Sequence, residues 1–146
     1  MQNLESSSTK NKKIKLDFKD SKYATGRRKI SIAKVWVKKG TGNIHVNGLK
    51  MNEYFKRPVH QIIVTRPLEI SEVASNYDVK CSVKGGGLSG QAGAIILGIS
   101  KALIAHDENL KKSLKKDKLT TRDSRVVERK KYGHRKARRS FQFSKR

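Results

Sequence analysis

The sequence has little cysteine, few aromatic residues and few acidic residues. Its one cysteine, Cys81, cannot form an intrachain disulfide, and this excludes a disulfide-stapled secreted scaffold. Aromatic residues make up 6% of the 146 residues and hydrophobic residues 35%. The longest apolar run, Ala92 to Ile99, is much shorter than the ~20 residues that a membrane-spanning helix needs. We therefore expect no membrane partner.

The sequence also lacks a pattern that indicates catalysis or metal binding. Its four histidines are scattered and do not have the spacing of a metal-ligand set. No combination of Ser, His and Asp, or of Cys and His, indicates nucleophilic catalysis. We expect no enzymatic activity, no cofactor, no metal and no small-molecule substrate. His45 is predicted to be an ordinary strand residue and Cys81 a small buried hydrophobic residue.

Positive charge is what the sequence has in abundance. Lys and Arg number 35 against 12 Asp and Glu, which gives a formal net charge of +23. Residues 111–146 alone hold 16 basic and 3 acidic residues, so about a quarter of the chain carries more than half of the excess. An excess of this size indicates a polyanionic partner.

The composition divides the chain into three parts. We expect a disordered polar extension over residues 1–21, a globular domain over residues 22–110, and a helix with an extended basic tail over residues 111–146. The extension has no arginine and no apolar core, unlike a transit peptide or a secretory signal. The stretch from Arg125 to Arg146 holds ten basic residues and one acid, Glu128, with few apolar residues. It should be disordered alone and become ordered on an anionic surface.

Several strands are predicted in the globular part. Apolar residues between Ile30 and Val37, a glycine-rich turn and Ile44–Val46 together predict a β-hairpin. The apolar positions change parity within the first strand, which suggests a bulge or a strand buried on both faces. Val59–Val64 is predicted to be a strand that ends at Pro67 or lies at a sheet edge. Tyr77–Lys84 alternates apolar and polar residues, so it should be a strand with one buried face.

Helices are predicted between and after these strands. Met51 to Phe55 should form one or two helical turns, and a more polar helix is expected over Glu108 to Lys116. A longer helix should begin near Gln91. Its apolar face would consist of residues at helical spacing: Ala92, Ile95, Ile96, Ile99 and Leu103. Strands and helices together in a chain of this length predict a small α+β domain.

A glycine-rich loop joins the predicted strand 77–84 to the long helix. Gly85, Gly87 and Gly90 match the G-x-G-x-x-G spacing of dinucleotide-binding folds, but the acid about 20 residues later ends a helix and not a second strand. Gln91-Ala92 also stands where a Walker loop requires Lys and Ser or Thr. We favour a loop that turns the chain sharply and exposes backbone N–H groups to an RNA phosphate.

The type of polyanion follows from the residues that surround the charges. Arginine offers a planar fork for phosphates, and arginine and aromatic rings can stack on unpaired bases. The recognition helices, zinc fingers and zippers that are typical of sequence-specific DNA readers do not appear. We favour RNA as the partner. The alternatives are a free-standing basic nucleic-acid-binding protein, such as a DNA-compacting protein, and a nucleotide-dependent enzyme that uses the glycine loop.

Several segments resemble the ribosomal protein S9 family of the small subunit. They are Val83 to Ala94 (VKGGGLSGQAGA), Leu119 to Lys131 (LTTRDSRVVERKK), the ending Gln142 to Arg146 (QFSKR), and the shorter matches Thr25 to Lys29 and Arg66 to Leu68. The resemblance covers about Tyr23 to Arg146, and the segment from Lys131 to Gln142 looks like the alphaproteobacterial and mitochondrial branch. Lys118 stands where the family pattern leads us to expect a glycine.

The resemblance implies an α+β fold like the second domain of ribosomal protein S5. This fold would be a sandwich with a four-stranded sheet, helices on one face and a long basic C-terminal tail. The resemblance also implies a structural constituent of the small ribosomal subunit, active in translation in the cytoplasm of a bacterium or, alternatively, in the mitochondrial matrix. The implied partners are small-subunit rRNA in the head, P-site tRNA and neighbouring head proteins.

The charge pattern and the resemblance together assign the candidate site residues. Those expected to bind rRNA are Arg27, Arg28, Lys29, Lys84, Gly86, Gly87, Gln91, Arg122, Arg125, Arg129, Lys130, Lys131, Arg135, Lys136, Arg138 and Arg139. Three residues at the end of the tail are expected, from the resemblance, to contact the P-site tRNA: Ser144, Lys145 and Arg146.

Overall fold

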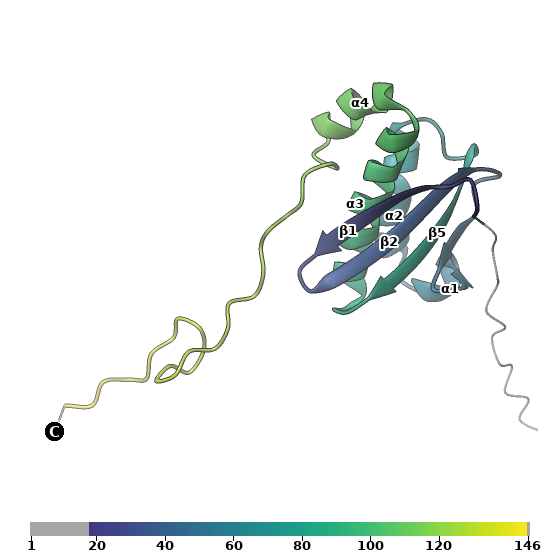
Figure 1. Ribbon diagram of the computed structural model, residues 1–146. Coiled ribbons are helices and arrows are strands. Elements are labelled where there is room, and N and C mark those ends of the chain that lie inside the picture. Colours follow the sequence, from purple (N-terminus) through teal and green to yellow (C-terminus); the bar gives the residue numbers. More distant parts are fainter. Residues whose placement is uncertain (1–17, 146) are drawn as a thin grey trace, which may run out of the picture.

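The computed structural model describes residues 18–145, so most of the expected N-terminal extension and the terminal Arg146 lie outside the described residues. The folded part has two layers, a β-sheet and a layer of helices on one of its faces (Figure 1). The strands are β1 (Lys22–Arg28), β2 (Ser31–Lys39), β3 (Ile44–Val46), β4 (Leu49–Lys50) and β5 (Tyr77–Lys84). The helices are α1 (Met51–Tyr54), α2 (Pro58–Ile70), α3 (Leu88–His106), the 3-10 turn η1 (Glu108–Leu110) and α4 (Lys111–Lys116).

The sheet has five strands in the order β1-β2-β5-β3-β4, so the expected count of four was wrong, although the α+β class is correct. The fifth strand is the two-residue β4, which is too short to produce an alternating pattern in the sequence. The strands β1, β2 and β5 pair antiparallel, and β3 runs parallel to β5. Helix α2 lies in the connection between β3 and β5 and covers the same face of the sheet as α3 (Figure 1).

The predicted hairpin between the first apolar strand and Ile44–Val46 was wrong, because β5 lies between β2 and β3. The turn after β2 is held by β5 instead. Asp78 Oδ1 accepts hydrogen bonds from the backbone N–H groups of Thr41 and Asn43, at 2.9 and 2.8 Å. The chain therefore crosses the end of β5 and returns along its other side.

The parity change near Ile30 has a simple cause in the structure. Lys29 and Ile30 form the two-residue loop of a hairpin between β1 and β2, in which Arg28 pairs with Ser31. Lys29 has a positive φ of 52°, and Ile30 is 71% exposed. Ile30 is thus a loop residue and not a strand residue, and the predicted bulge or doubly buried strand was wrong.

The predicted strand Val59–Val64 was also wrong, because these residues belong to helix α2. Pro58 occupies the first turn of the helix, where a missing N–H costs nothing, and Pro67 lies inside the helix and not at its end. The residues of α2 that are buried recur at helical spacing: His60, Val64, Pro67 and Leu68. Packing against α3 overrides the strand preference of the β-branched residues in this segment.

The core lies between the sheet and the helices. Alternate residues of β2 and β5 point into it, and Cys81 is buried there as predicted. From the predicted face of α3, Ala92, Ile95, Ile99 and Leu103 are fully buried and Ile96 is partly buried. Among the described helices, α3 alone is long and apolar enough to cross a membrane by length and composition, but 56% of its apolar stretch is buried in this core, which accounts for its composition.

Candidate nucleic-acid interface

In the glycine loop after β5, the fold requires glycine at Gly85 and Gly86 but not at Gly87. Gly85 and Gly86 have positive φ angles of 77° and 63°, and a side chain at Gly86 would overlap the hydroxyl of Ser31. That hydroxyl donates a hydrogen bond to the carbonyl oxygen of Gly85, at 3.0 Å. Gly87 has an ordinary φ of −102°, and a Cβ there would meet nothing within 4 Å. The open space beside Gly87 leaves the backbone at the start of α3 accessible to a ligand.

Gln91, which is expected from the sequence to bind rRNA, holds the glycine loop in place. Its Nε2 donates to the carbonyl oxygen of Gly85 at 3.2 Å, and its Oε1 accepts from the hydroxyl of Tyr54 at 2.7 Å. Asn47 supports this pair, since its Nδ2 lies 3.3 Å from the Tyr54 hydroxyl and its Oδ1 accepts from the N–H of Val83 at 2.8 Å. Both ends of the Gln91 amide are thus engaged within the protein.

Neither Asn47 nor Tyr54 was predicted from the sequence to be part of this region. Both reach the loop because β3 lies parallel to β5, which brings the end of β3 and helix α1 beside the end of β5. Only the Asn-Gly pair at Asn47 gave a local signal, and that signal indicated a turn.

The start of the C-terminal tail is attached to the end of β1 by a small ionic network. Arg28 Nη2 lies 3.0 Å from Asp123 Oδ2, and Arg28 Nη1 donates to the carbonyl oxygen of Arg125 at 3.2 Å. Arg125 closes the network, with its Nη2 2.7 Å from Asp123 Oδ2 and its backbone N–H 2.9 Å from Asp123 Oδ1. The hydrogen bonds from Arg125, aided by the charge of Arg28, hold the pKa of Asp123 far below its usual range.

This network places the tail beside the glycine loop. A hollow of about 260 Å³ lies between them, and its lining comes from the β1–β2 loop, the glycine loop and the tail: Lys29, Ile30, Ser31, Gly86, Gly87, Gly90, Val126 and Val127. Arg27 and Arg28 line an adjoining hollow with Thr121 and Asp123. The structure therefore brings Arg27, Arg28, Lys29, Gly86 and Gly87 together with the start of the tail.

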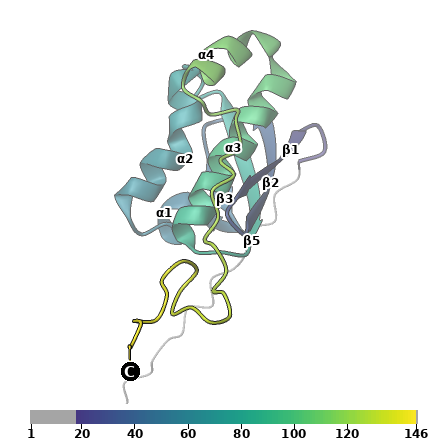
Figure 2. The same cartoon turned by 90° about the vertical axis from the view of Figure 1, so that its left-hand side faces the viewer.

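The remaining candidate residues lie elsewhere. Lys84 is exposed at the end of β5, and Arg122 is exposed at the start of the tail. The other candidate cations of the tail are all exposed and lie away from the two layers (Figure 2): Arg129, Lys130, Lys131, Arg135, Lys136, Arg138 and Arg139. Ser144 and Lys145 are exposed near the end of the tail, and Arg146 lies outside the described residues.

The tail forms a small loop of its own after residue 127. Glu128 pairs with Arg138 through two hydrogen bonds, at 2.7 and 2.9 Å, and the N–H of Arg135 donates to the carbonyl oxygen of Arg139 at 2.8 Å. Arg135 also lies over the ring of Phe141, 5.4 Å from its centre. The other basic side chains of the loop are exposed to solvent, where they can meet phosphates.

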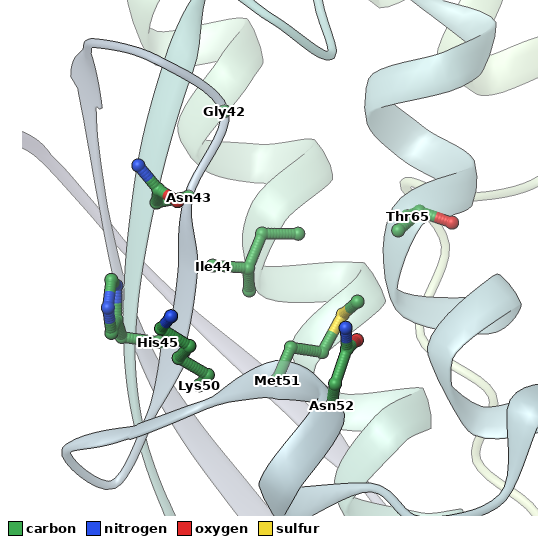
Figure 3. Close-up of a pocket in the computed structure, with 8 residues that line it drawn as sticks. All are labelled: Gly42, Asn43, Ile44, His45, Lys50, Met51, Asn52 and Thr65. Carbon is green, nitrogen blue, oxygen red and sulfur yellow. The ribbon is translucent and has the colours of Figure 1, made fainter.

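A third hollow, of about 210 Å³, lies at the other edge of the sheet, between β3, β4, α1 and α2 (Figure 3). Ile44, Met51 and Thr65 lie around it, and Ile44 and His45 point to opposite sides of β3. Within residues 18–145, none of the candidate site residues lines this hollow, and no acidic residue does. This hollow therefore lies outside the candidate interface.

Replacing Asp123 with Asn should loosen the start of the tail. The variant loses the charge that Arg28 and Arg125 share, so the backbone amide of Arg125 should exchange its hydrogen several times faster than in the wild type. In the wild type, the pKa of Asp123 in the folded protein is depressed. The contact of Asp123 with Arg28 and Arg125 should therefore persist at neutral pH and weaken only as the pH falls below about 4. Hydrogen exchange followed by mass spectrometry measures both effects. Unchanged exchange in the variant would contradict this role of Asp123.

The sequence was compared with models of known protein families. A family described as ribosomal protein S9/S16 matches residues 26–146. The match includes the end of β1, the glycine loop, the network around Asp123 and the whole tail.

Proposed function

This chain belongs to the ribosomal protein S9/S16 family, and from that premise we propose that it binds rRNA in the head of the small subunit and contacts P-site tRNA through its tail. Members of the family are structural proteins of the small ribosomal subunit and take part in translation. The observation that carries the proposal is that the family match spans both the glycine-loop region and the exposed cations of the tail.

Two surfaces of the protein would hold the rRNA. At the folded part, the open backbone at Gly87 can approach a phosphate closely, and Lys29 adds charge in the hollow that both residues line. Arg27 adds charge at the end of β1. Along the tail, the exposed arginines and lysines would neutralise phosphates and release their counterions. Arg28 and Arg125 would contribute mainly by fixing where the tail leaves the folded part, because both are engaged with Asp123.

The contact with tRNA depends on the length of the tail. At about 3.3–3.6 Å per residue, the stretch from Arg125 to Arg146 can span roughly 70 Å when extended. Its end can therefore reach a ligand far from the rRNA that holds the folded part. Lys145 and Arg146 would supply charge for the phosphates of the tRNA and Ser144 a hydroxyl.

Neighbouring head proteins are the remaining proposed partners. Helix α2 carries two apolar side chains that are largely exposed, Val59 at 63% and Ile62 at 61%. They lie one helical turn apart, so they form a small apolar patch of the kind that protein interfaces use. We propose the ribosome of a bacterial cytoplasm as the location, with the mitochondrial matrix as the alternative.

Sedimentation of the tagged protein in a cell lysate tests the proposal. The tagged chain should co-sediment with the small ribosomal subunit and stay with it after a wash in moderate salt. A free-standing nucleic-acid binder would sediment with bulk DNA or RNA instead. Absence of the chain from small-subunit particles would overturn the ribosomal assignment.

The glycine loop provides a sharper test of rRNA binding. Gly87→Ala should leave the free energy of unfolding within about 0.5 kcal/mol of the wild type but weaken rRNA binding, because the added methyl group occupies the space that a phosphate would use. Gly86→Ala is the matched control for stability, because it adds the same methyl group to the adjacent glycine of the loop. It should destabilise the fold by about 1–3 kcal/mol, since it forces a positive φ and an overlap with Ser31. Wild-type rRNA affinity in a folded Gly87→Ala variant would contradict the contact.

Deletion of the last three residues tests the tRNA contact. Small subunits that carry the shortened chain should assemble normally, because the described residues among the three, Ser144 and Lys145, are exposed on the tail and lie outside the core. Their affinity for P-site tRNA should fall severalfold, as measured by filter binding to purified subunits. Equal tRNA affinity in mutant and wild-type subunits would show that the end of the tail does not have this role.

A further inference from the structure

The face of the sheet that points away from the helices carries no helix in the described part of the chain (Figure 1). Its residues are those that alternate with the core residues along each strand. They comprise Tyr23, Thr25 and Arg27 of β1, Ile32, Lys34, Trp36 and Lys38 of β2, Asp78, Lys80, Ser82 and Lys84 of β5, His45 of β3 and Lys50 of β4. We call this surface the outer sheet face.

One row of side chains crosses all five strands of the outer sheet face. The strand register places Tyr23 opposite Trp36, Trp36 opposite Lys80, Lys80 opposite His45 and His45 opposite Lys50. The rings of Tyr23 and Trp36 are 5.3 Å apart at an angle of 43°. Lys80 Nζ lies 5.9 Å from the centre of the Trp36 ring and 5.8 Å from that of Phe18, which approaches from the segment before β1.

The aromatic residues of this protein are few, and their distribution is informative. The chain has four tyrosines, four phenylalanines and one tryptophan. Tyr54, Phe55 and Tyr77 belong to the core or its edge, and Tyr132, Phe141 and Phe143 are exposed in the basic tail. The other three, Phe18, Tyr23 and Trp36, meet at the outer sheet face, where Tyr23 is 48% exposed. A cluster of aromatic side chains on an exposed face indicates a binding surface.

The outer sheet face is predominantly positive. Its strands carry Arg27 and five lysines against a single acid, Asp78. The carboxylate of Asp78 keeps its negative charge, but the backbone N–H groups of Thr41 and Asn43 hold it near the start of β5, at one end of the face, and the six cations outnumber it. Aromatic rings interleaved with cations suit unpaired bases and their phosphates. A protein partner would have to match this charge with an acidic surface.

We propose that the outer sheet face is a second RNA-binding surface, which takes a single-stranded stretch of rRNA. Unpaired bases stack on Tyr23 and Trp36, and the phosphates beside them meet Lys34 on β2 and Lys84 on β5. This surface lies on the opposite side of the sheet from α3, so it would hold a different segment from the one at the tail (Figure 1). The identification of this RNA as rRNA rests on the proposed function.

Trp36 is the only tryptophan in the chain, so its fluorescence reports on this surface alone. The test titrates the full-length protein with a short single-stranded RNA of mixed sequence and, separately, with a duplex of the same composition. The single strand should quench Trp36 strongly, and the duplex should quench it much less. Tyr23→Ala should raise the RNA concentration at the midpoint of quenching by roughly five- to a hundredfold. Tyr23→Phe, which keeps a ring, should leave this concentration unchanged. Lys34→Ala should weaken binding and lower its salt dependence by about one phosphate contact.

Two matched controls remove the same groups elsewhere on the protein. Tyr132→Ala removes an exposed aromatic ring from the tail, and Lys115→Ala removes an exposed lysine from α4. Neither should shift the midpoint of Trp36 quenching. An equal shift from either control would mean that net charge or tail binding, and not the outer sheet face, determines the signal, and it would overturn the inference.

Three further results would overturn the inference. The first is unchanged Trp36 fluorescence at concentrations where a labelled RNA binds the protein. The second is equal quenching by duplex and single strand. The third is a photo-crosslinker at position 34 that, in assembled subunits, reacts with a protein and not with rRNA. A chain that assembles into small subunits but shows no quenching refutes only this surface, whereas quenching without assembly into subunits refutes only the ribosomal assignment.

Discussion

Replacing Gly26 with alanine is expected to lower the free energy of unfolding by about 3 kcal/mol or more and the melting temperature by more than ~10 °C. Gly26 lies in β1 on the face that packs against α3. A Cβ at this position would overlap the carbonyl oxygen of Ala94 and lie 2.6 Å from the backbone nitrogen of Gly98. Both obstacles are backbone atoms of a helix, so no side chain can rotate away to relieve the overlap.

The strand cannot relieve the overlap at low cost either. All seven residues of β1, from Lys22 to Arg28, are paired with β2, so moving Gly26 away from α3 distorts that register. The distortion would also displace Arg28, which holds Asp123 at the start of the tail. Gly26→Ala should therefore loosen both the fold and the attachment of the tail.

Denaturant unfolding of the full-length chain, followed by circular dichroism, measures the change in stability. Gly87→Ala is the matched control, because it adds the same methyl group to a glycine that has open space beside it. A Gly26→Ala variant within about 1 kcal/mol of the wild type would show that β1 and α3 can separate at little cost.

The elements that the sequence predicted well are those whose pattern is local and strong. The strand at Tyr77–Lys84 alternates without interruption, and the helix that follows it repeats its apolar residues at helical spacing. The structure places both where the pattern indicated, although α3 begins at Leu88, slightly before the expected Gln91. Burial on one face enforces each pattern, so the pattern is readable without knowledge of the partner.

The errors arose where a partner distant in the sequence decides the structure. Nothing between Gly40 and Val46 indicates that β3 pairs in parallel with β5, because Asp78, which fixes the turn, lies more than 30 residues away. The segment from Val59 to Val64 is rich in β-branched residues, and these favour a strand until packing against α3 is known. Local preference is a weak guide whenever tertiary packing opposes it.

For the candidate site too, the sequence identified residues but not the contacts between distant segments. Composition and resemblance pointed to Arg28, Gln91 and Arg125 as candidates, but they did not show that these three side chains engage other parts of the protein. The distinction between residues that hold the site and residues free to bind a ligand depends on distances between segments far apart in the chain. The outer sheet face was missed for the same reason, since Tyr23, Trp36 and Lys80 come together only through the register of three strands.

Removing four charges from the tail is expected to weaken binding to small-subunit rRNA by roughly 10²–10³-fold at physiological salt. The positions are exposed and do not pair with a carboxylate in the described part of the chain: Arg129, Lys131, Lys136 and Arg139, each replaced by Gln. Removal of one phosphate interaction should lower the slope of log K against log salt by about 0.7–0.9, so the total change should be about 3. The melting temperature should stay near that of the wild type, because these side chains lie outside the core.

The control for this prediction removes the same four charges from the folded part. Lys111, Lys112, Lys115 and Lys116 are exposed on α4, so their replacement by Gln gives the same net charge. If the tail binds rRNA through defined phosphate contacts, the α4 variant should keep most of its affinity and its salt slope. Equal losses in the two variants would mean that total charge alone drives binding. In that case the position of the cations on the tail would not matter, and the tail would act only as a counterion for rRNA.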